Sequence, residues 1–176
     1  LSLNNLQNSL NSKFHEERMV ALLILVNQFN KSDDAQKDQI FKFYLRNTRN
    51  INNWDLVDLT APNIVGAFLL NDKKDILYEM AESKNLWERR IAVLATFAFI
   101  RDKQFSDAIK IAELLLKDNH DLIHKAVGWM LREAGKRDLS VLESFLNKNY
   151  KSMPRTMLRY AIERLPKERK QFYMQK

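Results

Sequence analysis

Two residues in the first third of the chain combine an aromatic ring with a carboxylate on the same helical face. In a helix that starts near Asn53, steps of about 100° per residue place Trp54 and Asp58 on one side. Leu56 and Leu59 fall roughly opposite, and we expect both to face the core. Trp54 is then an indole presented to a groove, with a carboxylate one turn away that can stabilise positive charge.

A second helix, expected over Leu122 to Ala134, carries an aromatic side chain between two cations. Its apolar residues gather on one face, while Lys125, Trp129 and Arg132 fall together on the other. A surface that follows a phosphate backbone and packs against sugar or base uses both kinds of group. The alternative is that Trp129 fills a gap between repeated units of the fold.

Other cations have less specific patterns. Arg89 and Arg90 begin a segment that is apolar almost all round. Cations at a helix N-terminus are disfavoured unless an acid or a phosphate compensates, so one of the two is expected to support structure. Arg155 and Arg159 form an i, i+4 basic pair that either binds an anion or simply solubilises the surface.

The motifs of several enzyme classes are missing from the sequence. His120 and His124 have the spacing of two metal ligands, but no third ligand is obvious and the HExxH pattern is absent, so we expect no metal. There is no glycine-rich phosphate loop and no nucleophile elbow. These absences argue against nucleotide-binding and hydrolase functions of the usual kinds, and no cofactor is expected.

Composition predicts one all-helical domain over residues 1–176. Only three glycines and three prolines occur, too few for the turns of a many-stranded fold. With no cysteine and no apolar run of about 18 residues, we expect a cytoplasmic protein without a transmembrane helix. The 29 basic residues outnumber the 22 acidic ones, and the pI is about 9.6, so a polyanion is the first partner to consider.

Hydrophobic periodicity predicts a series of helices that repeat along the chain. The expected helices cover residues 14–29, 35–48, 53–59, 62–70, 73–82, 86–101, 105–117, 122–134, 139–149 and 154–165, with Gly135 closing one of them. A basic residue precedes an apolar helix at Arg18, Arg90, Lys125 and, more loosely, Arg155. The separations of 72, 35 and 30 residues suit stacked helix pairs that curve into a solenoid with a concave face.

Four segments of the sequence resemble the AlkD family of DNA alkylation-repair glycosylases. They are residues 51–58 (INNWDLVD), 86–92 (LWERRIA), 121–133 (DLIHKAVGWMLRE) and 153–163 (MPRTMLRYAIE). The similarity runs from about His15 to the final helix. It implies a HEAT-like superhelix that cradles duplex DNA and excises cationic lesions, such as 3-alkyladenine and 7-alkylguanine, without the base extrusion other glycosylases use. A monomer is the simplest expectation for its oligomeric state.

The resemblance also implies roles for individual residues. By position, Asp58 matches the catalytic carboxylate of the family, and Trp54 and Trp129 match aromatic residues beside the deoxyribose of the lesion. Arg90 and Arg132 match arginines that hold the DNA backbone. Lys125, Arg155 and Arg159 are further candidates for DNA binding. Because the sequence given opens at Leu1 and the similarity begins near His15, we expect the usual N-terminal helices of the family to be missing from it.

Two other functions remain open at this point. One is a noncatalytic DNA-binding protein that keeps the groove without turnover. The other is a helical-repeat scaffold for extended acidic peptides. The placement of Trp54, Asp58 and Trp129 on faces that the core does not need argues against the scaffold.

Overall fold

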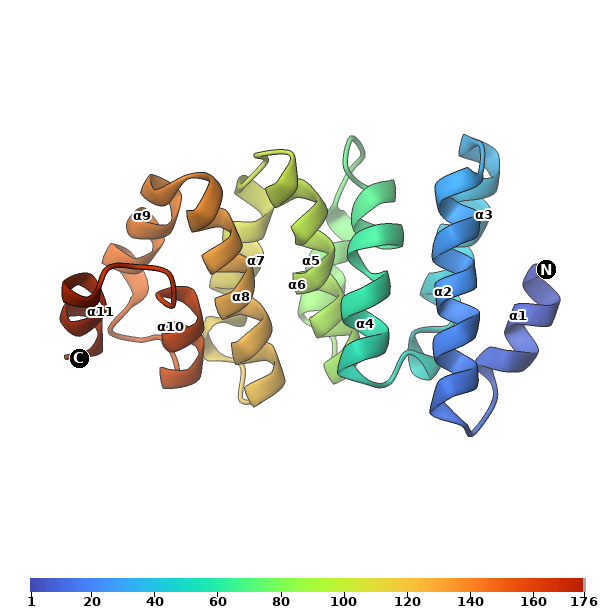
Figure 1. Cartoon of the computed structure of the whole chain (residues 1–176), viewed down its shortest axis with the longest axis horizontal. Coiled ribbons are helices and arrows are strands. Elements are labelled where there is room, and N and C mark those ends of the chain that lie inside the picture. The colour runs from blue at the N-terminus through green and yellow to red at the C-terminus, as the bar shows by residue number, and fades with distance from the viewer. Residues whose placement is uncertain (176) are drawn as a thin grey trace.

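A computed structural model describes residues 1–175, and the regular structure over that range is entirely helical (Figure 1). The helices are α1 (Leu3–Leu10), α2 (His15–Lys31), α3 (Asp34–Arg46), α4 (Trp54–Thr60), α5 (Asp75–Ala81), α6 (Leu86–Arg101), α7 (Ser106–Leu114), α8 (Asp121–Arg137), α9 (Leu139–Asn149), α10 (Arg155–Ala161) and α11 (Lys167–Met174). Short helical turns occur at η1 (Thr48–Asn50), η2 (Pro62–Gly66) and η3 (Leu115–Lys117). The expected all-α class is confirmed.

The helices form two rows that run the length of the molecule. Helices α2, α4, α6, α8 and α10 make the front row, and each packs against the next. Helices α3, α5, α7 and α9 lie behind them (Figure 1). Three of the predicted repeat starts, Arg18, Arg90 and Lys125, fall near the beginning of front-row helices, and the fourth, Arg155, begins α10. The structure is therefore the helical-repeat solenoid that the spacing predicts.

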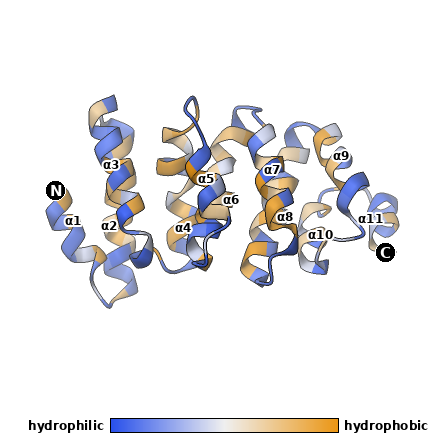
Figure 2. Cartoon of the chain, turned by 180° about the vertical axis from the view of Figure 1, so that it is seen from behind, coloured by the Kyte–Doolittle hydropathy of each residue, from blue (hydrophilic) through white to orange (hydrophobic). Residues whose placement is uncertain are grey.

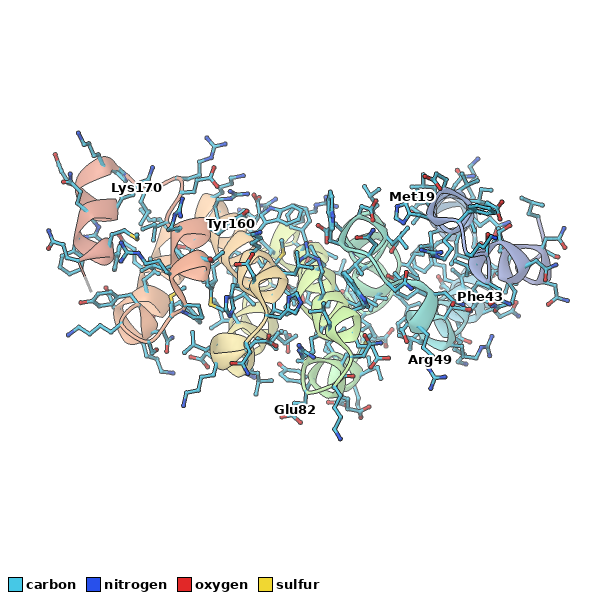
Figure 3. The ribbon with its side chains drawn as sticks, turned by 90° about the horizontal axis from the view of Figure 1, so that it is seen from below. Met19, Phe43, Arg49, Glu82, Tyr160 and Lys170 are labelled. Carbon is cyan, nitrogen blue, oxygen red and sulfur yellow. The ribbon has the colours of Figure 1, made fainter. Side chains whose placement is uncertain are left out.

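The rows are bent, and the front row lines the hollow side of the bend. Seen from below, Met19 on α2 and Tyr160 on α10 lie along one edge, whereas Arg49 and Glu82 lie along the opposite edge (Figure 3). The ribbon of the front row recedes between its two ends in the same view. Side chains on this face of α4, α6, α8 and α10 therefore converge toward a common space.

The core lies between the two rows and is centred on α6. Nine residues of α6 are buried, including Thr96, whose hydroxyl donates to the Val93 carbonyl oxygen at 2.6 Å. From behind, the hydrophobic residues follow the helix sides that meet their neighbours, and hydrophilic residues dominate the connecting turns (Figure 2). This burial agrees with the sequence pattern, in which the segment that Arg89 and Arg90 begin is apolar almost all round.

The segment that begins with Trp54 is one interrupted helix, where the sequence predicts two. After α4 the chain continues into η2, a π-turn in which the Gly66 amide donates to the Ala61 carbonyl oxygen at 2.9 Å. Pro62 has no N–H, so it cannot bond the carbonyl one turn earlier, which belongs to Asp58. Such π-turns are frequent at functional sites. A methyl group on Gly66 would lie 2.2 Å from the Ala95 carbonyl oxygen, so the glycine permits close packing of η2 on α6.

Three other sequence predictions about the helices need correction. A helix, α1, precedes His15, and α11 follows the last helix that periodicity predicted. Both are short and mostly polar, so their apolar period is weak. Gly135 does not end a helix: α8 continues through it to Arg137, and the Asp138 side chain then caps α9 by accepting from the Ser140 amide. Glycine inside a helix costs only about 1 kcal/mol, which packing of α8 against α9 offsets.

Gly128 sets the distance between α8 and α10, and an alanine there is expected to destabilise the protein. An added Cβ would lie 2.5 Å from both the Met157 carbonyl oxygen and the Tyr160 Cβ. Overpacking against backbone typically costs about 1–3 kcal/mol, so Gly128→Ala should lower the free energy of unfolding in urea by that amount. Gly135→Ala is the matched control, because its Cβ would meet only side-chain atoms of Leu142. Equal losses in the two variants would contradict this reading.

Candidate active site

The predicted aromatic and acidic residues are brought together at one cavity on the hollow side. The cavity has a volume of about 310 Å³. Its walls come from α4, α6, α8 and α10, and the lining residues are Trp54, Asp58, Arg90, Leu122, Lys125, Trp129 and Tyr160. Residues separated by as many as 106 positions in sequence, from Trp54 to Tyr160, thus share one small space. Four successive front-row helices are needed to build it.

Asp58 is held in place by Arg90 from the neighbouring helix. The Arg90 Nε donates to Asp58 Oδ1 at 2.8 Å, and Nη2 donates to Oδ2 at 2.8 Å. The remaining terminal nitrogen, Nη1, donates to the Leu122 carbonyl oxygen at 2.5 Å. The Arg90 side chain is 5% exposed and that of Asp58 is 13% exposed. This two-point pairing fixes the plane of the carboxylate as well as its position.

Arg90 lines the cavity, but its guanidinium is largely buried and bonded to protein groups on α4 and α8. Its expected contact with the DNA backbone stays a prediction. The neighbouring Arg89 is structural, as one of the two was expected to be: it pairs with Asp118 at 2.7 Å and donates to the Ser83 carbonyl oxygen at 2.9 Å. Both arginines at the start of α6 therefore bind within the protein.

The pKa of Asp58 is raised above the ordinary value of an aspartate. Burial is the largest cause, because it disfavours the charged form. The hydrogen bond and the charge of Arg90 act in the opposite direction, and the nearby charge of Asp55 raises the pKa further. Asp55 itself does not line the cavity and contacts His15 on α2 at 2.8 Å. The site therefore contains one partly desolvated, oriented carboxyl group.

The two indoles lie on the cavity wall in different ways. Trp54 is 53% exposed at the start of α4, where the Asn53 side chain accepts from the Trp54 amide at 2.8 Å and caps the helix. Trp129 is partly buried against the core, and its ring lies 6.0 Å from that of Phe97. Trp129 therefore fills space between repeats and also lines the cavity, and its contact with sugar or base stays a prediction.

Leu59 does not face the core, contrary to the sequence prediction. It is 47% exposed, whereas Leu56 is fully buried. The buried face of α4 consists of Leu56, Val57 and Thr60, with the Thr60 hydroxyl hydrogen bonded to Tyr44 at 2.8 Å. The core face is therefore rotated toward Val57, which leaves Leu59 beside Asp58 on the open side.

Tyr160 is a wall of the cavity that sequence reasoning missed. It lies on α10 and is 36% exposed. The buried residues of that helix are Met157, Leu158 and Ala161, which leaves the ring of Tyr160 outside the core. The face argument that identifies Trp54 would also have found it, because a tyrosine outside the core face of a short amphipathic helix carries the same signal.

The predicted DNA-binding cations are only partly brought together. Lys125 lines the cavity and pairs with Asp121 at 2.7 Å. Arg132 lies about two turns farther along α8, is 17% exposed and pairs with Glu163. Arg155 donates to the Met174 carbonyl oxygen at 3.1 Å, and Arg159 is exposed on α10. Arg132, Arg155 and Arg159 do not line the cavity of Asp58.

The two histidines that have metal-ligand spacing contact the backbone at the start of α8. The Leu122 amide donates to His120 Nδ1 at 3.2 Å, so His120 caps the helix. His124 Nε2 lies 2.5 Å from the Asp118 carbonyl oxygen. Within residues 1–175, no group of three or more potential ligands is placed to hold a metal ion. None of the helices in that range has the length and hydropathy of a membrane-spanning segment either.

The fold and the cavity define a helical-repeat protein with a basic composition and a cavity on its hollow side that an acid and aromatic rings line together. The family model described as DNA alkylation repair enzyme matches residues 3–165, and the chain belongs to this family. DNA is therefore its partner, and repair of alkylated DNA is its role. The match begins within α1, well before the start at His15 that the sequence motifs suggested.

A solved structure supports the fold assignment. It is described as a predicted DNA alkylation repair enzyme from Enterococcus faecalis, and it superposes with a TM-score of 0.76 at 17% sequence identity. The likeness covers 94% of this chain and 76% of that chain. At 17% identity, this likeness supports a shared fold and nothing further. No curated protein matches the sequence.

Proposed function

We propose that the protein is a DNA glycosylase that hydrolyses the N-glycosidic bond of cationic alkylated purines, such as 3-alkyladenine and 7-alkylguanine, in duplex DNA. The observation that carries the proposal is the oriented carboxylate of Asp58 in a cavity walled by Trp54 and Trp129. Alkylation at a ring nitrogen makes the purine a good leaving group, so bond cleavage leaves positive charge on the deoxyribose. A single carboxylate beside that sugar stabilises the developing charge.

The size of the effect suits a labile bond. A carboxylate about 4 Å from a unit positive charge gains about 4 kcal/mol at an effective dielectric of 20. That energy corresponds to about three powers of ten in rate. Arg90 partly cancels the negative charge, which makes this figure an upper value. This stabilisation accelerates the loss of a cationic base but is too small to release a normal purine. Selectivity for the lesion therefore comes partly from the lability of its own glycosidic bond.

The residues of the cavity then have distinct roles. Asp58 stabilises the oxocarbenium-like sugar and orients water, because each of its oxygens retains an acceptor position beyond the bond to Arg90. Trp54 and Trp129 pack against the deoxyribose. Arg90 positions the carboxylate without contacting the substrate. Lys125, at the cavity wall, and Arg132, farther along α8, bind phosphates near the lesion. In this arrangement the sugar approaches the protein, and the base need not leave the stack.

An excision assay tests the proposal directly. The full chain is incubated with a duplex that contains one 7-methylguanine, and release of the free base is followed under single-turnover conditions. Release faster than spontaneous depurination is the expected result. Binding of the duplex without any release would instead support the noncatalytic DNA-binding alternative and would overturn the glycosylase.

The excision rate is expected to fall on the acid side at a higher pH than an ordinary aspartate would give. The ionised form of Asp58 is the active one, so activity is present above its pKa and is lost as pH falls through it. Because burial raises that pKa, the loss begins at a higher pH. A single-turnover pH profile on 7-methylguanine DNA measures the acid limb. A rate that stays constant down to the ordinary range of aspartate titration would contradict the assignment.

A further inference from the structure

The net positive charge is confined to one part of the chain. Residues 1–100 contain 12 basic and 12 acidic side chains, whereas residues 101–176 contain 17 basic and 10 acidic ones. The whole excess of +7 therefore lies beyond residue 100. Phosphate contacts dominate the affinity of proteins for DNA. Most contacts with the DNA backbone should therefore come from residues at the end of α6 and beyond it.

Arg101, at the C-terminal end of α6, is prepared for such a contact in an unusual way. Its guanidinium carbon lies 4.1 Å from the centre of the Phe97 ring, so the group is stacked on an aromatic face. Its side chain is exposed, and no carboxylate within residues 1–175 pairs with it. By contrast, Arg132 and Arg137 each have a carboxylate partner. Arg101 is thus a cation held in one orientation by a ring and left without a counter-charge.

Phe97 links this cation to the active site. Its ring lies 6.0 Å from the indole of Trp129, and the Arg137 guanidinium carbon lies 5.6 Å from its centre. Along α6, steps of about 100° put Arg90, Phe97 and Arg101 within about 40° of one another. Arg90, which pairs with Asp58, therefore lies on the same side of α6 as Phe97 and Arg101.

The distance between the two sites can be expressed in base pairs. The eleven residues from Arg90 to Arg101 span about 16 Å at 1.5 Å per residue. A solenoid curves about an axis that is parallel to its front-row helices, and the bend seen in Figure 3 has this direction. A duplex in the hollow therefore runs along α6. With a rise of 3.4 Å per step, the two sites lie about five base pairs apart.

We propose that Arg101, stacked on Phe97, binds a DNA backbone phosphate about five base pairs from the nucleotide that faces Asp58. The contact itself depends on DNA as the partner, and its distance from the lesion rests on the proposed function. A flat guanidinium presents its N–H edge to a phosphate, and stacking limits the rotamers that binding would otherwise have to freeze. The contact lengthens the footprint of the protein in one direction along the duplex.

Salt dependence of binding to an unmodified duplex tests the contact without any need for catalysis. Loss of one phosphate contact should reduce the slope of log K against log salt by about 0.9, which is about an eightfold loss of affinity at 0.1 M salt. Arg101→Ala is expected to show both changes by fluorescence anisotropy. Arg101→Lys should keep most of the slope, since it keeps the charge. An unchanged slope in Arg101→Ala would overturn the proposal.

Arg46→Ala is the matched control. Arg46 is also an exposed arginine in the last turn of its helix, but α3 belongs to the back row. Both variants lose one positive charge and the same favourable interaction with a helix C-terminus. Arg46→Ala is expected to bind like the parent protein. If both variants lose affinity and slope equally, the effect is general charge and Arg101 has no specific contact.

Shortened duplexes test the position of the contact. Each carries an uncleavable abasic-site analogue at a fixed place, and one arm ends about three base pairs from it on one side or the other. The penalty of Arg101→Ala should disappear for one of these duplexes and persist for the other. Equal losses of affinity on the two shortened duplexes would overturn the proposed position of the contact. A reduced salt slope together with no base release by the parent protein would leave this contact standing and reject the glycosylase.

Discussion

Asp58→Asn is expected to lower the single-turnover rate of 7-methylguanine release by up to about a thousandfold. The variant keeps the shape of the side chain and an oxygen that accepts from Arg90, but it loses the charge that stabilises the sugar cation. The expected factor follows from about 4 kcal/mol of electrostatic stabilisation. Affinity for duplex DNA should be retained or improved, because a negative charge that faces the backbone has been removed.

Asp55→Asn provides a matched control three residues away on the same helix. It removes a carboxylate of the same kind, but one that contacts His15 outside the cavity. Its excision rate should stay within a few fold of the parent. If Asp58→Asn kept the parent rate, or if Asp55→Asn lost as much activity, the assignment of the charge-stabilising group to Asp58 would fail.

Arg90→Ala is expected to damage both stability and activity. It removes both guanidinium bonds from the Asp58 carboxylate, whose side chain is only 13% exposed in the parent protein. Removing one partner of a buried ion pair typically costs about 3–5 kcal/mol, which urea denaturation measures directly. The pKa of Asp58 should rise further once the arginine that lowers it is gone, so the acid limb of the excision profile should move to still higher pH.

A double variant separates the ion pair from the simple loss of a side chain. Arg90→Leu combined with Asp58→Leu removes both charges, and much of the lost stability should return, because no buried charge remains unpaired. Excision should be lost in that variant, because the Asp58 carboxylate is gone. Arg90→Lys should fall between the parent and Arg90→Ala, because an ammonium cannot hold both oxygens in the same fork. A double variant as unstable as Arg90→Ala would show that the pair is not the source of the loss.

Periodicity was sufficient to predict the helical class and the front row of the solenoid. A basic residue recurs near the beginning of a front-row helix, as at Arg90 and Lys125, because all front-row helices begin along the same edge of the solenoid. The sides of Trp54 and Asp58 followed from the helical angle alone. These features are local, since they depend on residues within one or two turns of each other.

The partner of Asp58 could not be predicted in this way. Arg90 lies 32 positions away, and the distance between the two helices depends on packing that no single-helix pattern contains. An arginine at the start of a helix was expected to pair with an acid or with a phosphate. The sequence alone did not decide which of these two partners Arg90 has. Leu59 was misplaced for a related reason, because the side of α4 that faces the core is decided by contacts with α6 and α2.

The bonds of Arg90 span three neighbouring units, because its own helix is α6 and its acceptors lie on α4 and α8. A stack of repeats flexes by small rotations between adjacent units. Any such rotation must carry Asp58 with it or break a bond to the guanidinium. The location of the carboxylate is therefore tied mechanically to the curvature of the stack, so under the proposed mechanism that curvature sets how closely acid and sugar meet.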